Sequence, residues 1–219
     1  RSTADAFAEY ADVISRTLGD RVKNWVTHNE PACSAWLGYE IGVHAPGIVD
    51  PTHALAVRAA HHLLLSHGLA VPVIRRNSAN AEVGITLTSN WNVAASNSAM
   101  DLDALRRGEG KWVRWFADPV YGRGYPADIV EDFKQLGAFP NGMDFVQDGD
   151  LKIIAVPTDF LGVNFYNRGV VRVNDPKNEP QTVFPSPKTP ENWTEMGWEV
   201  YPDGLLNVLA RYYFDYQPL

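Results

Sequence analysis

The sequence predicts an α/β fold in which short apolar strands alternate with helices. Three apolar runs have the length and composition of buried strands: Val22–Val26, Val83–Thr88 and Leu161–Tyr166. Helical patterns, with apolar residues recurring every three or four positions, lie between these runs. This alternation is typical of a parallel sheet covered by helices. The sequence shows no internal repeat and no linker, so residues 1–219 are expected to form a single domain.

The helical patterns follow in chain order. The first pattern ends before Gly19 and consists of Phe7, Tyr10, Ala11, Ile14 and Leu18. The second pattern is predicted to stop at Gly68 and consists of Leu55, Ala59, His62, Leu63 and Ser66. A third region runs from Leu102 to Phe116 with interruptions at Gly108 and Gly110, and a fourth begins at Pro126 and ends at Gly137. The last pattern runs from Leu205 to Tyr216. Between the third strand and this helix, Asn174–Pro190 contains five prolines and predicts a long irregular connection of the kind that often shapes a site.

A glutamate follows the first predicted strand at its carboxyl end. The run Trp25-Val26-Thr27-His28-Asn29-Glu30-Pro31 ends in a proline that cannot continue a sheet ladder. In parallel barrels the chemistry is found at this edge of the sheet. The run by itself leaves open a structural glutamate that caps a helix or pairs with an arginine.

This run resembles the T-x-N-E-P signature of retaining β-glycosidases of glycoside hydrolase family 1. Four further segments resemble the family in the same order: Gly38–Gly47, Arg114–Pro126, Asp159–Tyr166 and Met196–Pro202. The resemblance covers nearly the whole chain. It implies a (β/α)8 TIM barrel, of which these residues would form a partial barrel of about three to four β/α units.

The resemblance also implies roles for individual residues. Glu30 would be the general acid/base, and Asn29 would bind the sugar 2-hydroxyl. Tyr166 would donate a hydrogen bond to the nucleophile, and Trp198 would lie under the leaving group. Asn164, two residues before Tyr166, would share its face of the strand and also bind substrate. The alternatives are a pair of polar residues in the barrel core for Asn164 and Tyr166, and a core tryptophan for Trp198.

The family's nucleophile is not expected among these residues. In the family, the segment matched by Tyr216–Leu219 precedes the strand with the T-E-N-G nucleophile, a motif that this sequence lacks. Nothing here resembles the first three strands of the family either. The chain is therefore expected to be the central part of a barrel, to be inactive alone, and to pair with a complementary chain or the remainder of the barrel.

The predicted function is a retaining β-glycosidase that hydrolyses terminal β-D-glucosides of the cellobiose or aryl-glucoside type by a double displacement between two carboxylates. Its substrate would be a small β-glucoside or oligosaccharide, as in cellulose degradation. Two alternatives remain open. One is a catalytically inactive barrel fragment that needs a complementary chain, and the other is a 6-phospho-β-glycosidase.

Composition excludes several other classes of protein. With 19 basic and 26 acidic side chains the formal charge is −7, which argues against nucleic acid as a partner. No apolar run is long enough to span a bilayer, so no membrane partner is expected. The single cysteine, Cys33, favours a reducing, cytoplasmic compartment, and it resembles a packed small side chain because the sequence places no base beside it. His61, His62 and His67 lack a carboxylate or thiolate to complete a ligand set, so neither a metal nor a cofactor is expected.

Overall fold

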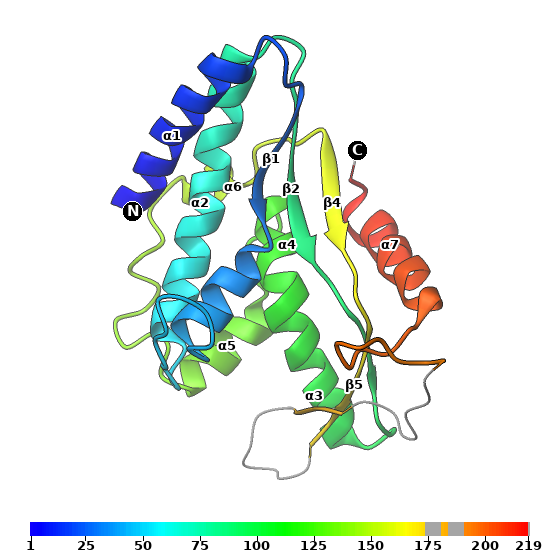
Figure 1. Ribbon diagram of the computed structural model, residues 1–219. Helices are drawn as coiled ribbons and strands as arrows, with labels where there is room; N and C mark the ends of the chain where they lie inside the picture. The colour runs from blue at the N-terminus through cyan, green and yellow to red at the C-terminus, as the bar shows by residue number, and fades with distance from the viewer. Residues whose placement is uncertain (174–180, 184–190, 219) are drawn as a thin grey trace. The chain divides into compact units, whose positions relative to one another are not determined.

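The computed structural model describes residues 1–173, 181–183 and 191–218 (Figure 1). The helices are α1 (Ser2–Leu18), α2 (Ala54–Asn77), α3 (Ala99–Glu109), α4 (Trp115–Val120), α5 (Ala127–Gln135), α6 (Asp150–Ile154) and α7 (Pro202–Tyr216), with π-helical turns η1 (Cys33–Leu37) and η2 (Gly110–Arg114). The strands are β1 (Asn24–Asn29), β2 (Glu82–Thr88), β3 (Trp91–Ala94), β4 (Phe160–Asn164), β5 (Arg168–Arg172) and β6 (Gln181–Val183). None of the described helices combines the length and the apolar content needed to cross a membrane.

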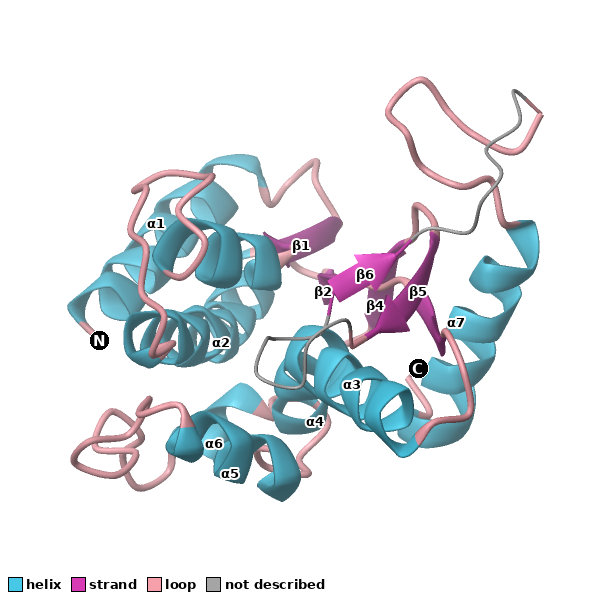
Figure 2. Cartoon of the chain, turned by 90° about the horizontal axis from the view of Figure 1, so that it is seen from below, coloured by secondary structure: helices cyan, strands magenta, loops and turns pink. Residues whose placement is uncertain are grey.

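The chain divides into two compact units. The first contains Arg1–Leu87, Trp115–Gly162 and Pro218, and the second contains Thr88–Arg114 and the described residues of Val163–Gln217. Figure 2 shows the helices of the chain in cyan and its strands in magenta. The expectation of a single domain stays a prediction.

Strands β1, β2 and β4 form one sheet in that order. β1 pairs with β2 in parallel, from Asn24 opposite Glu82 onward. Along β2 and β4, the amide of Asp159 donates to the carbonyl of Val83 at 2.9 Å, and the amide of Ser89 donates to the carbonyl of Asn164 at 2.9 Å. From the first bond to the second, the residue number increases along both strands, so β2 and β4 run in the same direction and this pair is parallel as well. The prediction of three adjacent parallel strands is therefore confirmed.

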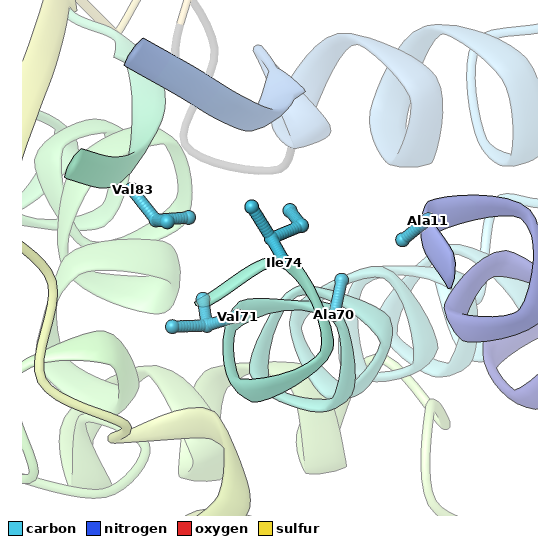
Figure 3. Close-up of a cluster of buried hydrophobic side chains, with 5 residues drawn as sticks. All are labelled: Ala11, Ala70, Val71, Ile74 and Val83. Carbon is cyan, nitrogen blue, oxygen red and sulfur yellow. The ribbon is translucent and has the colours of Figure 1, made fainter. Parts of the chain in front are cut away.

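A cluster of buried aliphatic side chains joins two helices of the first unit to this sheet. Ala70, Val71 and Ile74 of α2 lie between Ala11 of α1 and Val83 of β2 (Figure 3). The helices α1 and α2 run beside each other over much of their length (Figure 1). Small residues at this contact let the helices approach closely, and burial of each larger aliphatic side chain contributes about 1.5–3 kcal/mol.

Helix α2 does not stop at Gly68, as the sequence pattern predicts, but continues to Asn77. Position 68 has no room for a side chain, because a Cβ atom there would lie 2.2 Å from the carbonyl oxygen of Ile153. The predicted apolar stripe matches the buried face of this helix only in part, with Ser66 buried. Leu55 is 45% exposed, whereas Val57 and Leu64 are fully buried. The helix packs against several neighbours, so its buried surface is broader than a single stripe.

Two glycine substitutions should have opposite effects on stability. Gly68→Ala should lower the free energy of unfolding by about 1–3 kcal/mol, because the new methyl group meets backbone that cannot move aside cheaply. Gly108→Ala in α3 should raise it by about 0.4–1 kcal/mol, because nothing lies within 4 Å of its Cβ position and alanine favours the helix. Urea unfolding monitored by circular dichroism measures both changes. A stabilising Gly68→Ala would contradict the close contact with Ile153.

The second unit contains a small sheet that the sequence patterns do not predict. β3 pairs with β5 in parallel, and β5 pairs with β6 antiparallel. The helix α7 packs through Val208 and Tyr212, and the hydroxyl groups of Tyr212 and Ser89 lie 2.7 Å apart. The predicted irregular connection Asn174–Pro190 lies outside the described residues except for β6.

Three element boundaries differ from the predictions. The first strand begins at Asn24 instead of Val22 and continues to Asn29. Gly108 lies inside α3 instead of interrupting it, and a π-helical turn begins at Gly110. The third strand ends at Asn164, so that Tyr166 lies beyond it.

Candidate active site

Strand β1 carries one extra residue relative to β2 just before the predicted acid. Val26 pairs with Gly84, whereas Asn29, three positions later, pairs with Thr86, only two positions later on β2. Thr27 lies within this bulge, and its hydroxyl donates to the carbonyl of Gly84 at 3.2 Å. A bulge changes the direction in which the following side chains point and is frequent beside active sites. Asn29 and Glu30 thus come directly after the bulge, so their side chains need not alternate between the two faces of the sheet as in a regular strand.

Glu30 occupies a left-handed backbone conformation with φ +51°, which costs a non-glycine residue about 1–3 kcal/mol. Two hydrogen bonds hold it there. Its amide donates to the carbonyl of Thr86 at 2.9 Å, and its carbonyl accepts from the amide of Cys33 at 2.9 Å. Pro31 then begins the following helix, where a missing N–H group is no loss. The backbone thereby places a partly exposed carboxyl group at the junction between strand and helix, next to exposed Asn29.

The thiol of Cys33 donates a hydrogen bond to Oε2 of Glu30 across 3.4 Å. The expectation that no base lies beside Cys33 is therefore wrong, because the carboxyl group of Glu30 is its neighbour. A spacing of three residues brings the two side chains to the same face of the helical turn. This spacing is visible in the sequence and could have predicted the contact. Burial and the adjacent carboxylate raise the pKa of the Cys33 thiol to about 12. The thiol stays protonated at neutral pH, which makes it a donor to Glu30 and a poor nucleophile.

Alkylation of Cys33 should therefore be slow and should depend on Glu30. In Glu30→Gln the negative charge that favours the neutral thiol is removed, so the rate of iodoacetamide labelling at pH 8 should rise on the order of tenfold. Because this is the only cysteine among the 219 residues, mass spectrometry of the intact chain reads its labelling directly.

Glu82→Gln is the matched control, since Glu82 is an exposed glutamate at the start of β2. It should leave the labelling rate unchanged. Equal rates in Glu30→Gln and the native chain would show that burial alone protects the thiol.

Two histidine contacts tie β1, the strand before the candidate acid, to helix α2. Nδ1 of His67 lies 2.7 Å from the hydroxyl of Thr27, and Nε2 of His28 lies 2.7 Å from the hydroxyl of Ser66. Burial lowers the pKa of His67 to about 3 and that of His28 to about 4. Both rings are neutral at neutral pH. They act as hydrogen-bonding supports for the bulged strand and bring no positive charge to Glu30.

His61 of α2 contacts two polar side chains. Nδ1 of His61 lies 2.9 Å from the hydroxyl of Tyr125, and its Nε2 lies 3.1 Å from Oδ2 of buried Asp150. Burial opposes ionisation of Asp150, but hydrogen bonds from Arg1, the amide of Gln147 and His61 lower its pKa to about 2. Throughout the described ranges, no group of three or more His, Cys, Asp or Glu side chains could hold a metal ion.

In the second unit, the expected strand pair Asn164 and Tyr166 does not share a strand face. Asn164 is the last residue of β4, and its carbonyl accepts from the amide of Ser89. Tyr166 follows in the connection to β5 and is 45% exposed. Its ring contacts Trp198, with centroids 5.1 Å apart at 52°. The structure thus brings together two of the predicted residues, Tyr166 and Trp198, that are far apart in the sequence.

Trp198 lies on a tight hairpin spanning residues 192–200. The amide of Val200 donates to the carbonyl of Asn192 at 2.7 Å, and the amide of Thr194 donates to the carbonyl of Trp198 at 2.9 Å. Gly197 completes the turn with φ +77°, a conformation that glycine adopts without strain. The hairpin leaves Trp198 partly exposed among the described residues.

Comparison with known proteins identifies the family. The sequence profile of Glycosyl hydrolase family 1 matches residues 1–219. The chain is 38% identical to β-glucosidase A of Acetivibrio thermocellus, over 99% of this chain and 47% of that protein. It is 37% identical to a bifunctional β-D-glucosidase/β-D-fucosidase of Bifidobacterium breve, over 96% of this chain and 46% of that protein.

Solved structures give the same result. A β-glucosidase from Exiguobacterium marinum superimposes with a TM-score of 0.88 at 39% identity, over 99% of this chain and 47% of that one. The β-glucosidase from Thermotoga maritima in complex with glucoimidazole gives 0.87 at 33% identity, over 100% of this chain and 47% of that one. These likenesses confirm the predicted α/β fold, a partial (β/α)8 TIM barrel. The chain spans about half the length of the curated relatives it matches, and it belongs to glycosyl hydrolase family 1.

Proposed function

We propose that this chain is the central part of a retaining β-glycosidase that acts on terminal β-D-glucosides of the cellobiose or aryl-glucoside type. The observation that carries the proposal is the placement of Glu30. Its carboxyl group follows a bulged strand end, in a backbone conformation held from both sides, within a chain of glycosyl hydrolase family 1. The names of the relatives, which are β-glucosidases, support the substrate class.

Glu30 acts as the general acid/base in this proposal. A retaining mechanism needs a second carboxylate about 5–5.5 Å away, which attacks the anomeric carbon while the acid protonates the leaving oxygen. The acid then becomes the base that activates water to cleave the glycosyl-enzyme. The thiol of Cys33 donates a hydrogen bond to the carboxyl group of Glu30 and so helps to hold it in place.

The other site residues keep the roles that the family motif implies. Asn29 binds the 2-hydroxyl of the sugar, and Asn164 contributes to substrate binding. Tyr166 donates a hydrogen bond to the nucleophile, and Trp198 lies under the leaving group. The ring contact between Tyr166 and Trp198 supports this assignment, because an exposed pair of aromatic rings offers an apolar face to a sugar or an aryl group.

The nucleophile is proposed to come from the remainder of the barrel, supplied by a complementary chain or by a longer polypeptide. The T-E-N-G motif is absent from these 219 residues, so the isolated chain should not hydrolyse glucosides. Strand β1 supports a barrel partner. It has a strand neighbour on one side only among the described residues, and its Val26 side chain is 48% exposed. A cytoplasmic location stays a prediction.

Reconstitution with the missing barrel segments tests the function. The chain alone should give no turnover of 4-nitrophenyl β-D-glucoside, whereas the chain combined with flanking segments of a family 1 relative should hydrolyse it. Proton NMR of the first product should show the β-anomer, since two displacements retain configuration. A first product in the α configuration would contradict the retaining mechanism. Turnover by the rigorously pure 219-residue chain would contradict the missing nucleophile.

A further inference from the structure

We propose that Arg168 and Glu199 position Trp198 and thereby determine how strongly the site holds a leaving group. The inference rests on the proposed function of Trp198, but its structural part stands on contacts within the second unit. Arg168 is the first residue of β5, and Glu199 directly follows Trp198 on the hairpin of residues 192–200. The pair joins two segments that are about thirty residues apart in the sequence.

The contact between the two side chains is a bidentate ion pair. Nε of Arg168 donates to Oε2 of Glu199 at 2.9 Å, and a terminal guanidinium nitrogen donates to Oε1 at 2.7 Å. Glu199 is 8% exposed, so both its oxygens are satisfied away from bulk water. The guanidinium group also lies over the ring of Tyr201, 4.4 Å from its centroid. Only arginine combines this planar fork with stacking on an aromatic ring.

The ion pair adds a second attachment to the aromatic contact. Tyr166 lies two residues before Arg168, and Trp198 lies one residue before Glu199, so the same two segments meet through a ring contact and an ion pair. The ion pair restricts rotation of the hairpin about the aromatic contact. The ring contact and the ion pair together hold the indole of Trp198 relative to Tyr166. Arg168 and Glu199 are therefore positioning residues, which act on the leaving group through Trp198.

Hydrogen exchange in the chain itself tests the positioning. Arg168→Lys keeps the charge but loses the fork, and Glu199→Gln keeps the shape but loses the charge. In both variants, exchange of the amides of Thr194, Trp198 and Val200 should become about tenfold faster. Arg172→Lys, at the exposed far end of the same strand, is the control and should change nothing. The amide of Glu30 in the first unit, bonded to Thr86, reports that the fold is retained.

Hairpin exchange within twofold of the native chain in both variants would overturn the proposal. So would an equal acceleration in Arg172→Lys, because the effect would then belong to the strand and not to the ion pair. Both variants are conservative in volume, and the Glu30 amide separates local loosening from global unfolding.

Leaving-group preference in the reconstituted barrel tests the consequence. Arg168→Lys should raise KM for 4-nitrophenyl β-D-glucoside about tenfold and leave β-D-glucosyl fluoride unchanged, because fluoride is too small to reach an aromatic platform. An equal loss with both substrates would overturn the role in leaving-group binding. If the native reconstituted barrel cleaves neither substrate, the proposed function fails, and the exchange experiment still decides the positioning.

Discussion

Replacing Glu30 by glutamine should slow hydrolysis of glucosides with poor leaving groups by about 10²–10⁴-fold in the reconstituted barrel, the usual contribution of general acid catalysis. The amide cannot protonate the departing oxygen. The loss should shrink for activated phenols, which leave without a proton, so a plot of rate against leaving-group pKa should become steeper. Steady-state kinetics with a series of aryl β-D-glucosides measures this slope.

A second measurement separates the two roles of Glu30. Azide should restore turnover of activated substrates by Glu30→Gln, because a small anion attacks the glycosyl-enzyme without needing a general base. Glu82→Gln, the exposed control on β2, should behave like the native protein. A loss that is equal for every leaving group, with no rescue by azide, would mean that Glu30 has a structural role only.

Replacing Trp36 by alanine should lower the free energy of unfolding by about 3–5 kcal/mol, the cost of removing a large aromatic side chain from a core. Trp36 is fully buried on η1, in the helical segment that begins directly after Glu30. Its ring lies 5.7 Å from that of Phe116, 5.8 Å from that of Phe133 and 6.5 Å from that of Trp115. The cavity left by the indole would loosen the segment that holds the carboxyl group of Glu30 in place.

Urea unfolding should show this loss as a lower midpoint concentration of urea, with no change in the dependence of the unfolding free energy on urea concentration. Phe214→Ala is the matched control, since Phe214 is 75% exposed on α7 and its truncation should change stability by no more than about 0.5 kcal/mol. Similar midpoints for Trp36→Ala and the native chain would contradict the packing around the indole.

Much of the fold follows from local patterns. The alternation of helices and strands and the position of α1 are predicted correctly, because each rests on periodicity within a short window. The parallel arrangement of the three strands is predicted from that alternation. The buried face of α2 is predicted only in part. Gly68 has the appearance of a helix stop, and only the carbonyl of Ile153 beside it explains why glycine is needed within the helix. The strands β3 and β5 are too short to be recognised without the partner that each provides for the other.

The candidate site divides in the same way. The sequence by itself determined the family and the identity of the candidate acid, because Glu30 lies within a motif whose residues are contiguous. The tertiary structure alone decided how that acid is held. The bulge in β1 is a mismatch in register with β2, and the left-handed conformation of Glu30 is maintained by a hydrogen bond to Thr86. Register and such bonds join strands that are distant in the sequence, so no local pattern contains them.

The same reason accounts for the second unit. Tyr166 and Trp198 were recognised individually from short motifs, but their ring contact and the ion pair of Arg168 with Glu199 join segments about thirty residues apart. A motif names the residue that performs a reaction, because the chemistry restricts which side chain can stand there. The residues that position this side chain belong to other segments that contact it in the folded protein, and those contacts form only when the chain packs.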